Sequence, residues 1–206
     1  AVGEGGTILT SRDGRNWTEQ TSASYPLFGV AYGNGTFVAV GEGGTILTSR
    51  DGRNWTRQTS GTSKDLDGVA YGNGTFVVVG EDGTVLTSPD GVTWTEQDSG
   101  TDYLLESVAY GNGTFVAVGE DGTILTSQDG RNWTWQTSRT SKDLDGVAYG
   151  NGTFVAVGEG GTILTSPDGR NWTEQDSGTY DPLSGVAYGN GTFVAVGKYG
   201  TILTSP

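Results

Sequence analysis

Short apolar runs alternate with glycine-rich polar turns along the chain, and the pattern returns about every 39 residues. Within the second unit it predicts four short strands, at 68–71, 75–79, 84–87 and 94–97. An Asn-Gly dipeptide separates the first two strands of each unit and is typical of a tight hairpin turn. The segment Tyr-Gly-Asn-Gly-Thr-Phe marks the five units and begins at Tyr32, Tyr71, Tyr110, Tyr149 and Tyr188.

The second strand of each unit is continuously apolar, as in Phe76 to Val79. A sheet with one wet face would alternate, so an unbroken apolar run indicates that both faces are covered. The fourth strand alternates, as at 55–58, which is typical of an outer edge. A buried middle and a polar edge in every unit predict an all-β fold. We expect a single five-bladed β-propeller over residues 1–206, with four antiparallel strands per blade.

The two ends of the chain resemble each other, because residues 1–12 are duplicated by residues 195–206. The first strand expected in the chain corresponds to the third strand of a unit, and so does the last strand expected in the chain. The final unit has no fourth strand of its own, and the first fourth strand has no first or second strand before it. We therefore expect a ring closed by one blade shared between the N- and C-termini, with one copy of the third strand left over.

Composition excludes several classes of function. The chain has no cysteine and no histidine, which excludes disulfides, thiolate catalysis and Cys/His metal sites. Its net charge of −13 disfavours binding to nucleic acid and to anionic membrane surfaces. No apolar stretch is long enough to span a membrane. We predict a monomer with no cofactor, no nucleic acid partner and no membrane insertion, which as a natural protein would be soluble and either secreted or at the cell surface.

The turn between the third and fourth strands repeats as Ser-x-Asp-Gly-x-x-Trp. Its aspartates are Asp13, Asp51, Asp90, Asp129 and Asp168, and its tryptophans are Trp17, Trp55, Trp94, Trp133 and Trp172. This motif resembles the Asp box, or bacterial neuraminidase repeat, and its surroundings are similar to the propellers of photosystem assembly factors and bacterial surface proteins. The resemblance implies a β-propeller in which these residues form structural corners. The carboxylate would accept hydrogen bonds from the turn's amides, and the indole would pack the turn onto the sheet.

The same resemblance raises sialidase chemistry, which needs an arginine cluster, a tyrosine nucleophile with a glutamate, and an acid/base aspartate. Most arginines lie in the repeated turns, as do Arg12, Arg53 and Arg170, and none stands at a ring-centre position. The chain is also too short for that family's usual six blades. With no histidine, no cysteine and no coherent acid pair, we predict that the chain is not an enzyme.

Differences among the units gather in the connection between each fourth strand and the next first strand. In a propeller these connections share a face with the turns that carry Glu42, Glu81, Glu120 and Glu159. Aromatic rings beside carboxylates are a common way to hold sugars. The candidate ligand-binding residues are Tyr25, Lys64, Asp65, Tyr103, Lys142, Asp143, Tyr180 and Asp181.

Two functions therefore stay open. The near-identical units favour a non-enzymatic, symmetric repeat scaffold, of engineered or recently amplified origin, with no evolved catalytic activity. The alternative is a multivalent, lectin-like propeller that binds glycans with its variable loop face. Trp135 is an isolated aromatic on an outer strand and fits either function.

Overall fold

The computed structural model describes residues 1–20 and 24–205, and nearly all of them form antiparallel sheets or the turns between strands. The first strands of the five units are β3 (Leu27–Gly33), β7 (Leu66–Gly72), β11 (Leu105–Gly111), β15 (Leu144–Gly150) and β19 (Leu183–Gly189). The second strands are β4 (Thr36–Gly41), β8 (Thr75–Gly80), β12 (Thr114–Gly119), β16 (Thr153–Gly158) and β20 (Thr192–Gly197). Each of these pairs forms a hairpin.

The third and fourth strands complete the sheets. The third strands are β1 (Leu9–Thr10), β5 (Thr45–Ser49), β9 (Val85–Ser88), β13 (Ile124–Ser127), β17 (Ile163–Ser166) and β21 (Ile202–Thr204). The fourth strands are β2 (Thr18–Glu19), β6 (Thr56–Gln58), β10 (Thr95–Gln97), β14 (Thr134–Trp135) and β18 (Thr173–Gln175). Four sheets have all four strands in sequence order, so the predicted antiparallel four-stranded unit is confirmed.

Positive backbone φ angles fix the turns inside each unit. At the hairpin between β7 and β8, Asn73 has φ 48° and Gly74 has φ 76°, as a type I′ turn requires. The second and third strands are joined by single 3-10 turns, in which the central residue also has positive φ. These turns are η1 (Glu4–Gly6), η2 (Glu42–Gly44), η3 (Glu81–Gly83), η4 (Glu120–Gly122), η5 (Glu159–Gly161) and η6 (Lys198–Gly200).

The core lies between sheets rather than within one. Phe76 and the three valines after it are fully buried, which confirms that both faces of the second strand are covered. The first strands also approach one another closely. A Cβ on Gly33 would lie 2.0 Å from the ring of Tyr71 in the next sheet, so this position accepts only glycine. The same glycine-on-tyrosine contact recurs at Gly72, Gly111 and Gly150.

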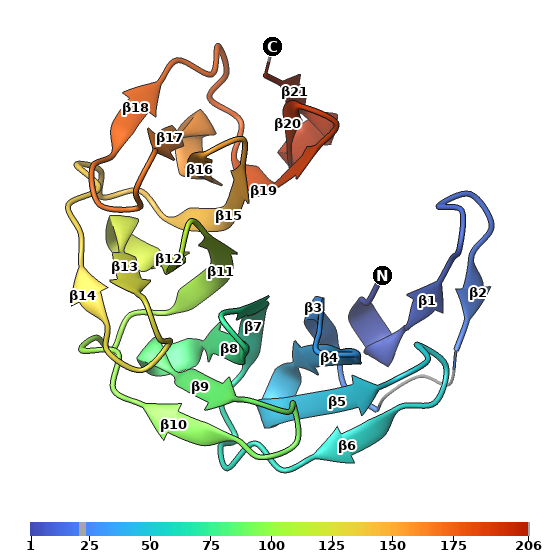
Figure 1. Cartoon of the computed structure of the whole chain (residues 1–206). Coiled ribbons are helices and arrows are strands. Elements are labelled where there is room, and N and C mark those ends of the chain that lie inside the picture. Colours follow the sequence, from blue (N-terminus) through green and yellow to red (C-terminus); the bar gives the residue numbers. More distant parts are fainter. Residues whose placement is uncertain (21–23, 206) are drawn as a thin grey trace.

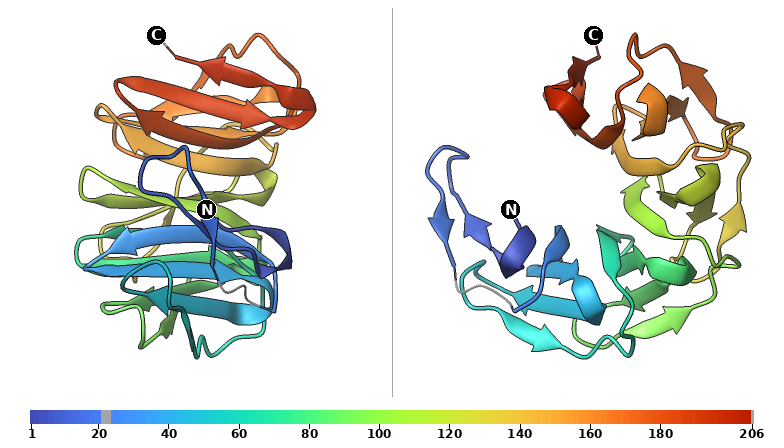
Figure 2. Two further views of the ribbon diagram at one scale, coloured as in Figure 1. Left: turned by 90° about the vertical axis from the view of Figure 1, so that its right-hand side faces the viewer. Right: turned by 180° about the vertical axis from the view of Figure 1, so that it is seen from behind.

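The sheets are arranged as blades around an open arc (Figure 1). The first strands β3, β7, β11, β15 and β19 line its inner side, and the fourth strands form its outer rim (Figures 1 and 2). The fourth strands are largely exposed, as expected for outer edges. Within the described residues, no helix has the length and apolar character needed to cross a membrane.

The structure does not contain the shared blade that the duplicated ends predicted. β1 pairs with β2 in a two-stranded sheet, whereas β21 pairs with β20 in a three-stranded sheet. Among the described residues no sheet joins the two ends, and a gap separates them (Figure 1). The duplicated third strand is compatible with this result. Each end holds its own copy of the third strand, and each copy pairs within its own end, so neither sheet has a vacant third-strand position.

Candidate functional site

The Ser-x-Asp-Gly-x-x-Trp turns, called corner turns below, are closed by their own side chains. In the third unit, Asp129 Oδ1 accepts hydrogen bonds from the backbone N–H groups of Arg131 and Asn132, both at 2.9 Å. The Asn132 amide donates to the other carboxylate oxygen at 2.8 Å. The Trp133 indole N–H donates to the Gly130 carbonyl at 2.9 Å. These contacts brace the turn and hold the indole beside it.

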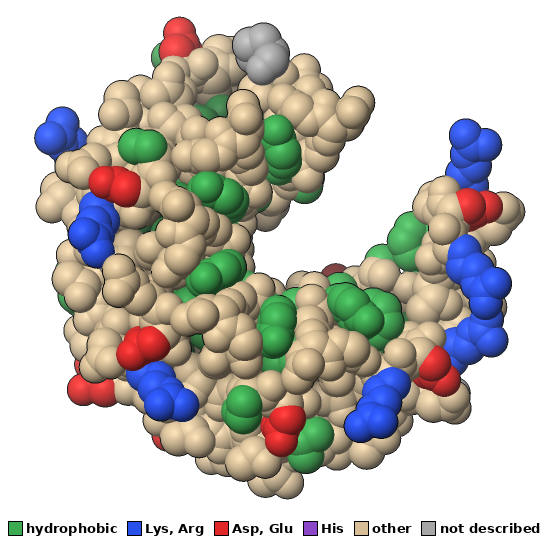
Figure 3. All heavy atoms as spheres, viewed as in Figure 1, with side chains coloured by type: hydrophobic (Ala, Val, Ile, Leu, Met, Phe, Trp, Pro, Cys, Tyr) green, Lys and Arg blue, Asp and Glu red, His purple; other side chains and the backbone are tan. Residues whose placement is uncertain are grey.

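The same bonds lower the pKa of the corner carboxylates. At all five corners the backbone N–H three residues after the aspartate is the largest cause, and it acts by stabilising the ionised form. The pKa of Asp168 falls to about 2. On the face seen in Figure 3, Lys and Arg side chains lie around the outer rim of the arc. The corner carboxylates are therefore already satisfied, and their chemistry is structural.

The variable connections do not bring the predicted tyrosines together. Tyr25 and Tyr103 hold the same position two units apart, and each contacts the fourth strand of its own blade. The Arg57 guanidinium lies 5.4 Å from the centroid of the Tyr25 ring, and the Trp135 ring lies edge-on to Tyr103 at 6.3 Å. Tyr180 is 92% exposed. The first variable connection, 22–26, lies partly outside the described residues.

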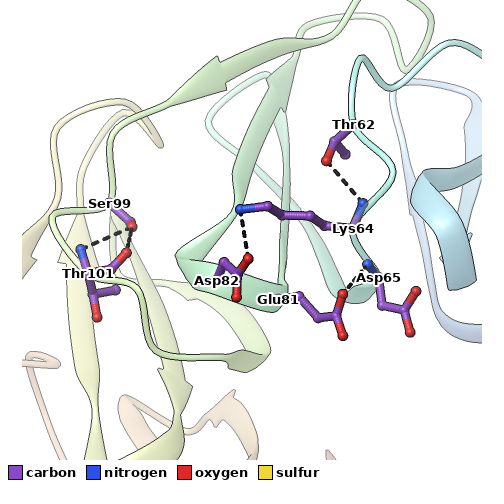
Figure 4. A network of polar contacts seen from close by, with 7 residues as sticks. All are labelled: Thr62, Lys64, Asp65, Glu81, Asp82, Ser99 and Thr101. Carbon is purple, nitrogen blue, oxygen red and sulfur yellow. Dashed lines mark hydrogen bonds and ion pairs between the residues drawn. The ribbon is translucent and has the colours of Figure 1, made fainter.

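The charged residues of these connections bind neighbouring turns (Figure 4). Lys64 forms an ion pair with Asp82 at 3.1 Å, and the backbone N–H of Asp65 donates to Glu81 at 3.0 Å. Asp65 also accepts a bond from the Gly43 N–H of the preceding blade at 2.8 Å. These contacts tie each connection to the adjacent 3-10 turns.

The remaining candidates follow the same pattern. Asp143 accepts a hydrogen bond from the Asp121 N–H at 2.9 Å, and Asp181 accepts one from the Thr201 hydroxyl at 2.6 Å. The Lys142 side chain lies against Gly160, which occupies the position of Asp82 two units earlier. The predicted acidic and basic candidates thus act as braces between turns, rather than converging on one pocket.

The structure presents a different set of side chains on the inner side of the arc. Each first strand contains a one-residue register shift, in which an extra residue stands opposite the second strand. Such β-bulges re-aim a side chain out of the regular alternation. The five bulge residues, called the inner row below, are Phe28, Asp67, Glu106, Asp145 and Ser184.

The three carboxylates of the inner row occupy consecutive blades and share one electrostatic environment. Burial is the main cause that raises the pKa of Glu106 to about 7, and the charges of Asp67 and Asp145 add to it. Burial, with Asp65 and Glu81, raises the pKa of Asp67 to about 6. Burial, with Glu159 and Asp143, raises the pKa of Asp145, and the charge of Lys198 opposes part of that rise. At neutral pH these carboxylates repel one another in a partly dehydrated position.

The described part of the chain supplies one cation near this row, Lys198, and it acts on Asp145 but not on Asp67 or Glu106. The single ion pair of the described residues is that between Lys64 and Asp82, and the Oδ2 atom of Asp67 is buried without a hydrogen-bond partner. Within residues 1–20 and 24–205, no three His, Cys, Asp or Glu side chains are grouped so as to hold a metal ion. At Asp67 and Glu106 the inner row therefore offers negative charge that the described residues leave uncompensated.

The sequence contains a signal for the inner row that the loop-based prediction missed. The first strands share the pattern Leu-x-Gly/Ser-Val-Ala-Tyr-Gly, and x is the position whose chemistry changes most from unit to unit. A single variable position inside a constant buried strand indicates a side chain that packing does not determine. The differences in the connecting loops are larger, and they drew the prediction to the loop residues that precede the inner row.

Comparisons with known proteins agree with this architecture. The family model described as the DUF6242 beta propeller domain matches residues 48–144. No curated protein matches the chain. A solved structure described as "YCF48 bound to D1 peptide" matches with a TM-score of 0.68 at 21% identity, over 87% of this chain and 63% of that chain. YCF48 from Cyanidioschyzon merolae matches with a TM-score of 0.71 at 17% identity, over 98% of this chain and 77% of that chain.

These matches define the fold. The chain has an all-β, propeller-like architecture of antiparallel four-stranded sheets, similar to that of YCF48. It spans 63% of the length of the first of these two structures, and at such low identities the likeness concerns the fold alone.

Proposed function

We propose that this protein is a non-catalytic binding propeller whose inner row receives a cationic segment of a peptide partner. The observation that carries the proposal is the set of three half-buried carboxylates, Asp67, Glu106 and Asp145, on consecutive inner strands. They lie on the first strands β7, β11 and β15, which line the inner side of the arc side by side, so three blades build this surface together (Figure 1).

The electrostatics favour a cation at this place. A carboxylate whose pKa lies near neutrality ionises at a cost, because burial and like charges oppose the ionised form. A Lys or Arg side chain brought between Asp67 and Glu106 would lower both pKa values and remove that cost. It would also give a partner to the buried Oδ2 atom of Asp67. Binding would therefore relieve a strain that the free protein contains.

The comparisons support a peptide as the source of the cation. The structure titled "YCF48 bound to D1 peptide" joins a propeller of similar fold to a peptide ligand. Strand edges and turns of a propeller offer many backbone groups to an extended chain. Simple metal binding has less support, because no group of three acidic side chains suitable for a metal ion occurs in the described residues.

The glycan alternative has less support than the peptide. Tyr25 and Tyr103 pack against side chains of their own blades, and Tyr180 stands apart from both. Asp65, Asp143 and Asp181 already accept hydrogen bonds from neighbouring turns. A sugar would have to break these contacts before it could use the carboxylates. We keep the scaffold part of the proposal, a repeat propeller without catalysis, and place the ligand on the inner row.

The test uses labelled oligolysine and oligoglutamate peptides, with affinity measured by fluorescence anisotropy at physiological ionic strength. We expect the oligolysine peptide to bind and the oligoglutamate peptide to fail. Binding should strengthen as the pH rises from about 6 to above about 7, where Asp67 and Glu106 become ionised. The variant with Asp67→Asn, Glu106→Gln and Asp145→Asn should lose both the binding and its pH dependence.

A matched control separates the inner row from the protein's general negative charge. The variant with Glu19→Gln, Glu96→Gln and Glu174→Gln removes the same number of charges from the outer fourth strands. It should bind the oligolysine peptide as the unmodified protein does. Equal losses in the two triple variants would show that net charge alone attracts the peptide, and the proposed site would then be wrong.

A further inference from the structure

The contact between successive blades is built four times from the same positions. In one example, Val116, Val118 and Ile124 of one blade pack against the next blade. The residues that receive them are Leu144, Val147, Phe154, Ala156, Leu164 and Trp172. Equivalent residues form the other blade contacts. In each contact, the surface that a blade presents to the next blade fits the surface by which the next blade receives it, and both surfaces are apolar.

At one end of the arc the donating surface is uncovered. Val194, Val196 and Ile202 are the counterparts of Val116, Val118 and Ile124, and we call them the C-terminal face. Val196 is 47% exposed and Ile202 is 67% exposed, whereas Val118 and Ile124 are completely buried. A cluster of large aliphatic side chains at this exposure is typical of a surface that packs against another protein.

At the other end the receiving surface is only partly covered. Val30 and Phe37, the counterparts of Val147 and Phe154, form what we call the N-terminal face. Val2 and Ile8 cover its outer part, where they pack against Leu27 and other buried residues of the blade β3–β6. Val30 is still 41% exposed, and a groove of about 920 Å³ lies between β1–β2 and the blade β3–β6. The sheet β1–β2 lacks the first and second strands that the complete blades have.

The C-terminal face and the N-terminal face are complementary, but within one chain they lie at opposite ends of the arc and do not meet. In the views of Figures 1 to 3 the gap separates β19–β21 from β1–β2. We propose that the C-terminal face of one chain packs on the N-terminal face of a second copy, so that copies associate head to tail. The strands β19, β20 and β21 of the first copy would then add to β2 of the second as one four-stranded blade.

The duplicated third strand makes this exchange possible. Thr7 to Ser11 and Thr201 to Ser205 have the same sequence, Thr-Ile-Leu-Thr-Ser. β21 of one copy can therefore take the place of β1 beside β2 of the next copy, with the same pairing partners and the same buried isoleucine. The exchange additionally buries Val194 and Val196 against Val30 and Phe37, which the free arc leaves uncovered. A contact between two different faces is heterologous and propagates unless the assembly closes.

The first test measures molar mass by light scattering after size-exclusion chromatography over a range of protein concentrations. The unmodified chain should form a concentration-dependent series of oligomers. Ile202→Lys blocks the C-terminal face, and Val30→Lys blocks the N-terminal face, so each variant should be monomeric. Val92→Lys changes an exposed valine on a corner turn, away from both faces, and should associate like the unmodified chain.

Mixing the blocked variants tests the head-to-tail geometry. Ile202→Lys keeps a free N-terminal face and Val30→Lys keeps a free C-terminal face, so the mixture should give a one-to-one dimer that grows no further. Circular dichroism and a cooperative melt establish that each variant is folded. An unmodified chain that stays monomeric at every concentration, including one closed into a ring on itself, overturns the proposal. So does a mixture that gives no dimer.

A second pair of variants tests the strand exchange. Ile8→Lys loosens β1 from the first blade, which should strengthen association because β21 of another copy then meets less competition. Ile202→Lys, the same change in an identical local sequence, should abolish association. An excess of Ile202→Lys chains should shorten the Ile8→Lys oligomers, because a chain with only a free N-terminal face can add at one end and stops further growth there. Equal weakening by both changes would show that β21 does not replace β1.

Discussion

The corner turns and the inner row place the same chemical group in opposite environments. The corner aspartate Asp129 accepts hydrogen bonds from two backbone N–H groups, and its pKa is lowered well below the ordinary value. The inner-row glutamate Glu106 is half-buried among other carboxylates, and its pKa is raised to about 7. One carboxylate stabilises the fold when ionised, and the other opposes it.

This difference separates what holds the blade from what the blade displays. The corner aspartate occurs in all five units, because the turn closes only around a carboxylate and a glycine of positive φ. The inner row changes from Phe28 through three acids to Ser184, because a bulge residue is free of the packing that fixes its neighbours. Constant positions in this repeat therefore indicate structure, and the variable bulge is where we propose the binding surface.

The largest effect should come from removing a corner carboxylate. Asp129→Ala leaves the Arg131 and Asn132 N–H groups without their acceptor, and we expect a loss of about 2–3 kcal/mol in the free energy of unfolding. Chemical denaturation at neutral pH measures it. Asp129→Asn keeps one acceptor oxygen and should cost less. An Asp129→Ala variant with an unchanged free energy of unfolding would show that the corner hydrogen bonds contribute no net stability. The contrast between the corner turns and the inner row would then not hold for the corner turns.

Neutralising the inner row should have the opposite sign. The variant with Asp67→Asn, Glu106→Gln and Asp145→Asn should be more stable than the unmodified chain at about pH 8, by about 2 kcal/mol after discounting for solvent screening. The physical reason is the removal of three half-buried charges, of which Glu106 is repelled by both of the others. Denaturant titration measures the gain, and the outer-strand variant with Glu19→Gln, Glu96→Gln and Glu174→Gln should show much less. A destabilised triple variant would mean that the inner carboxylates are compensated after all.

The pH dependence of stability should follow Glu106. Its pKa in the folded chain is about 7, above the ordinary value of 4.5, so the folded state binds more protons than the unfolded state between these values. Stability should therefore fall as the pH rises from about 5 to about 8, by about 1 kcal/mol for this group. Glu106→Gln should flatten that slope. The lowered pKa values of the corner aspartates affect stability only in more acidic solution, so they do not contribute to the change in stability over this pH range.

Much of the fold could be predicted from local sequence rules. The Asn-Gly dipeptides located the hairpins, and the unbroken run from Phe76 to Val79 indicated a strand covered on both faces. These features depend on residues near one another in the chain. Whether the two ends meet depends instead on the sum of small angles between successive blades, which no motif encodes. The duplicated third strand was compatible with both a closed ring and an open arc.

The candidate site was harder to predict for a related reason. Charge and aromatic content in the loops suggested Tyr25, Lys64 and Asp65, but the structure engages these side chains in contacts within and between blades. The inner row depends on a one-residue bulge in each first strand, and the sequence shows a bulge only as an unexplained variable position. Burial and the convergence of three blades then set the pKa values, and both are properties of the assembled arc.

The smallest effect tests whether the inner row acts as one electrostatic unit. Ser184 is exposed and lies in the blade after that of Asp145, so Ser184→Asp extends the acidic series by one blade. We expect a loss of about 0.5 kcal/mol at about pH 8 that disappears at about pH 5, because the added repulsion requires ionised carboxylates. Ser184→Asn provides the control of equal size without charge. If both variants have the same stability at both pH values, the charges of neighbouring blades are independent, and each inner carboxylate has to be explained by its own burial alone.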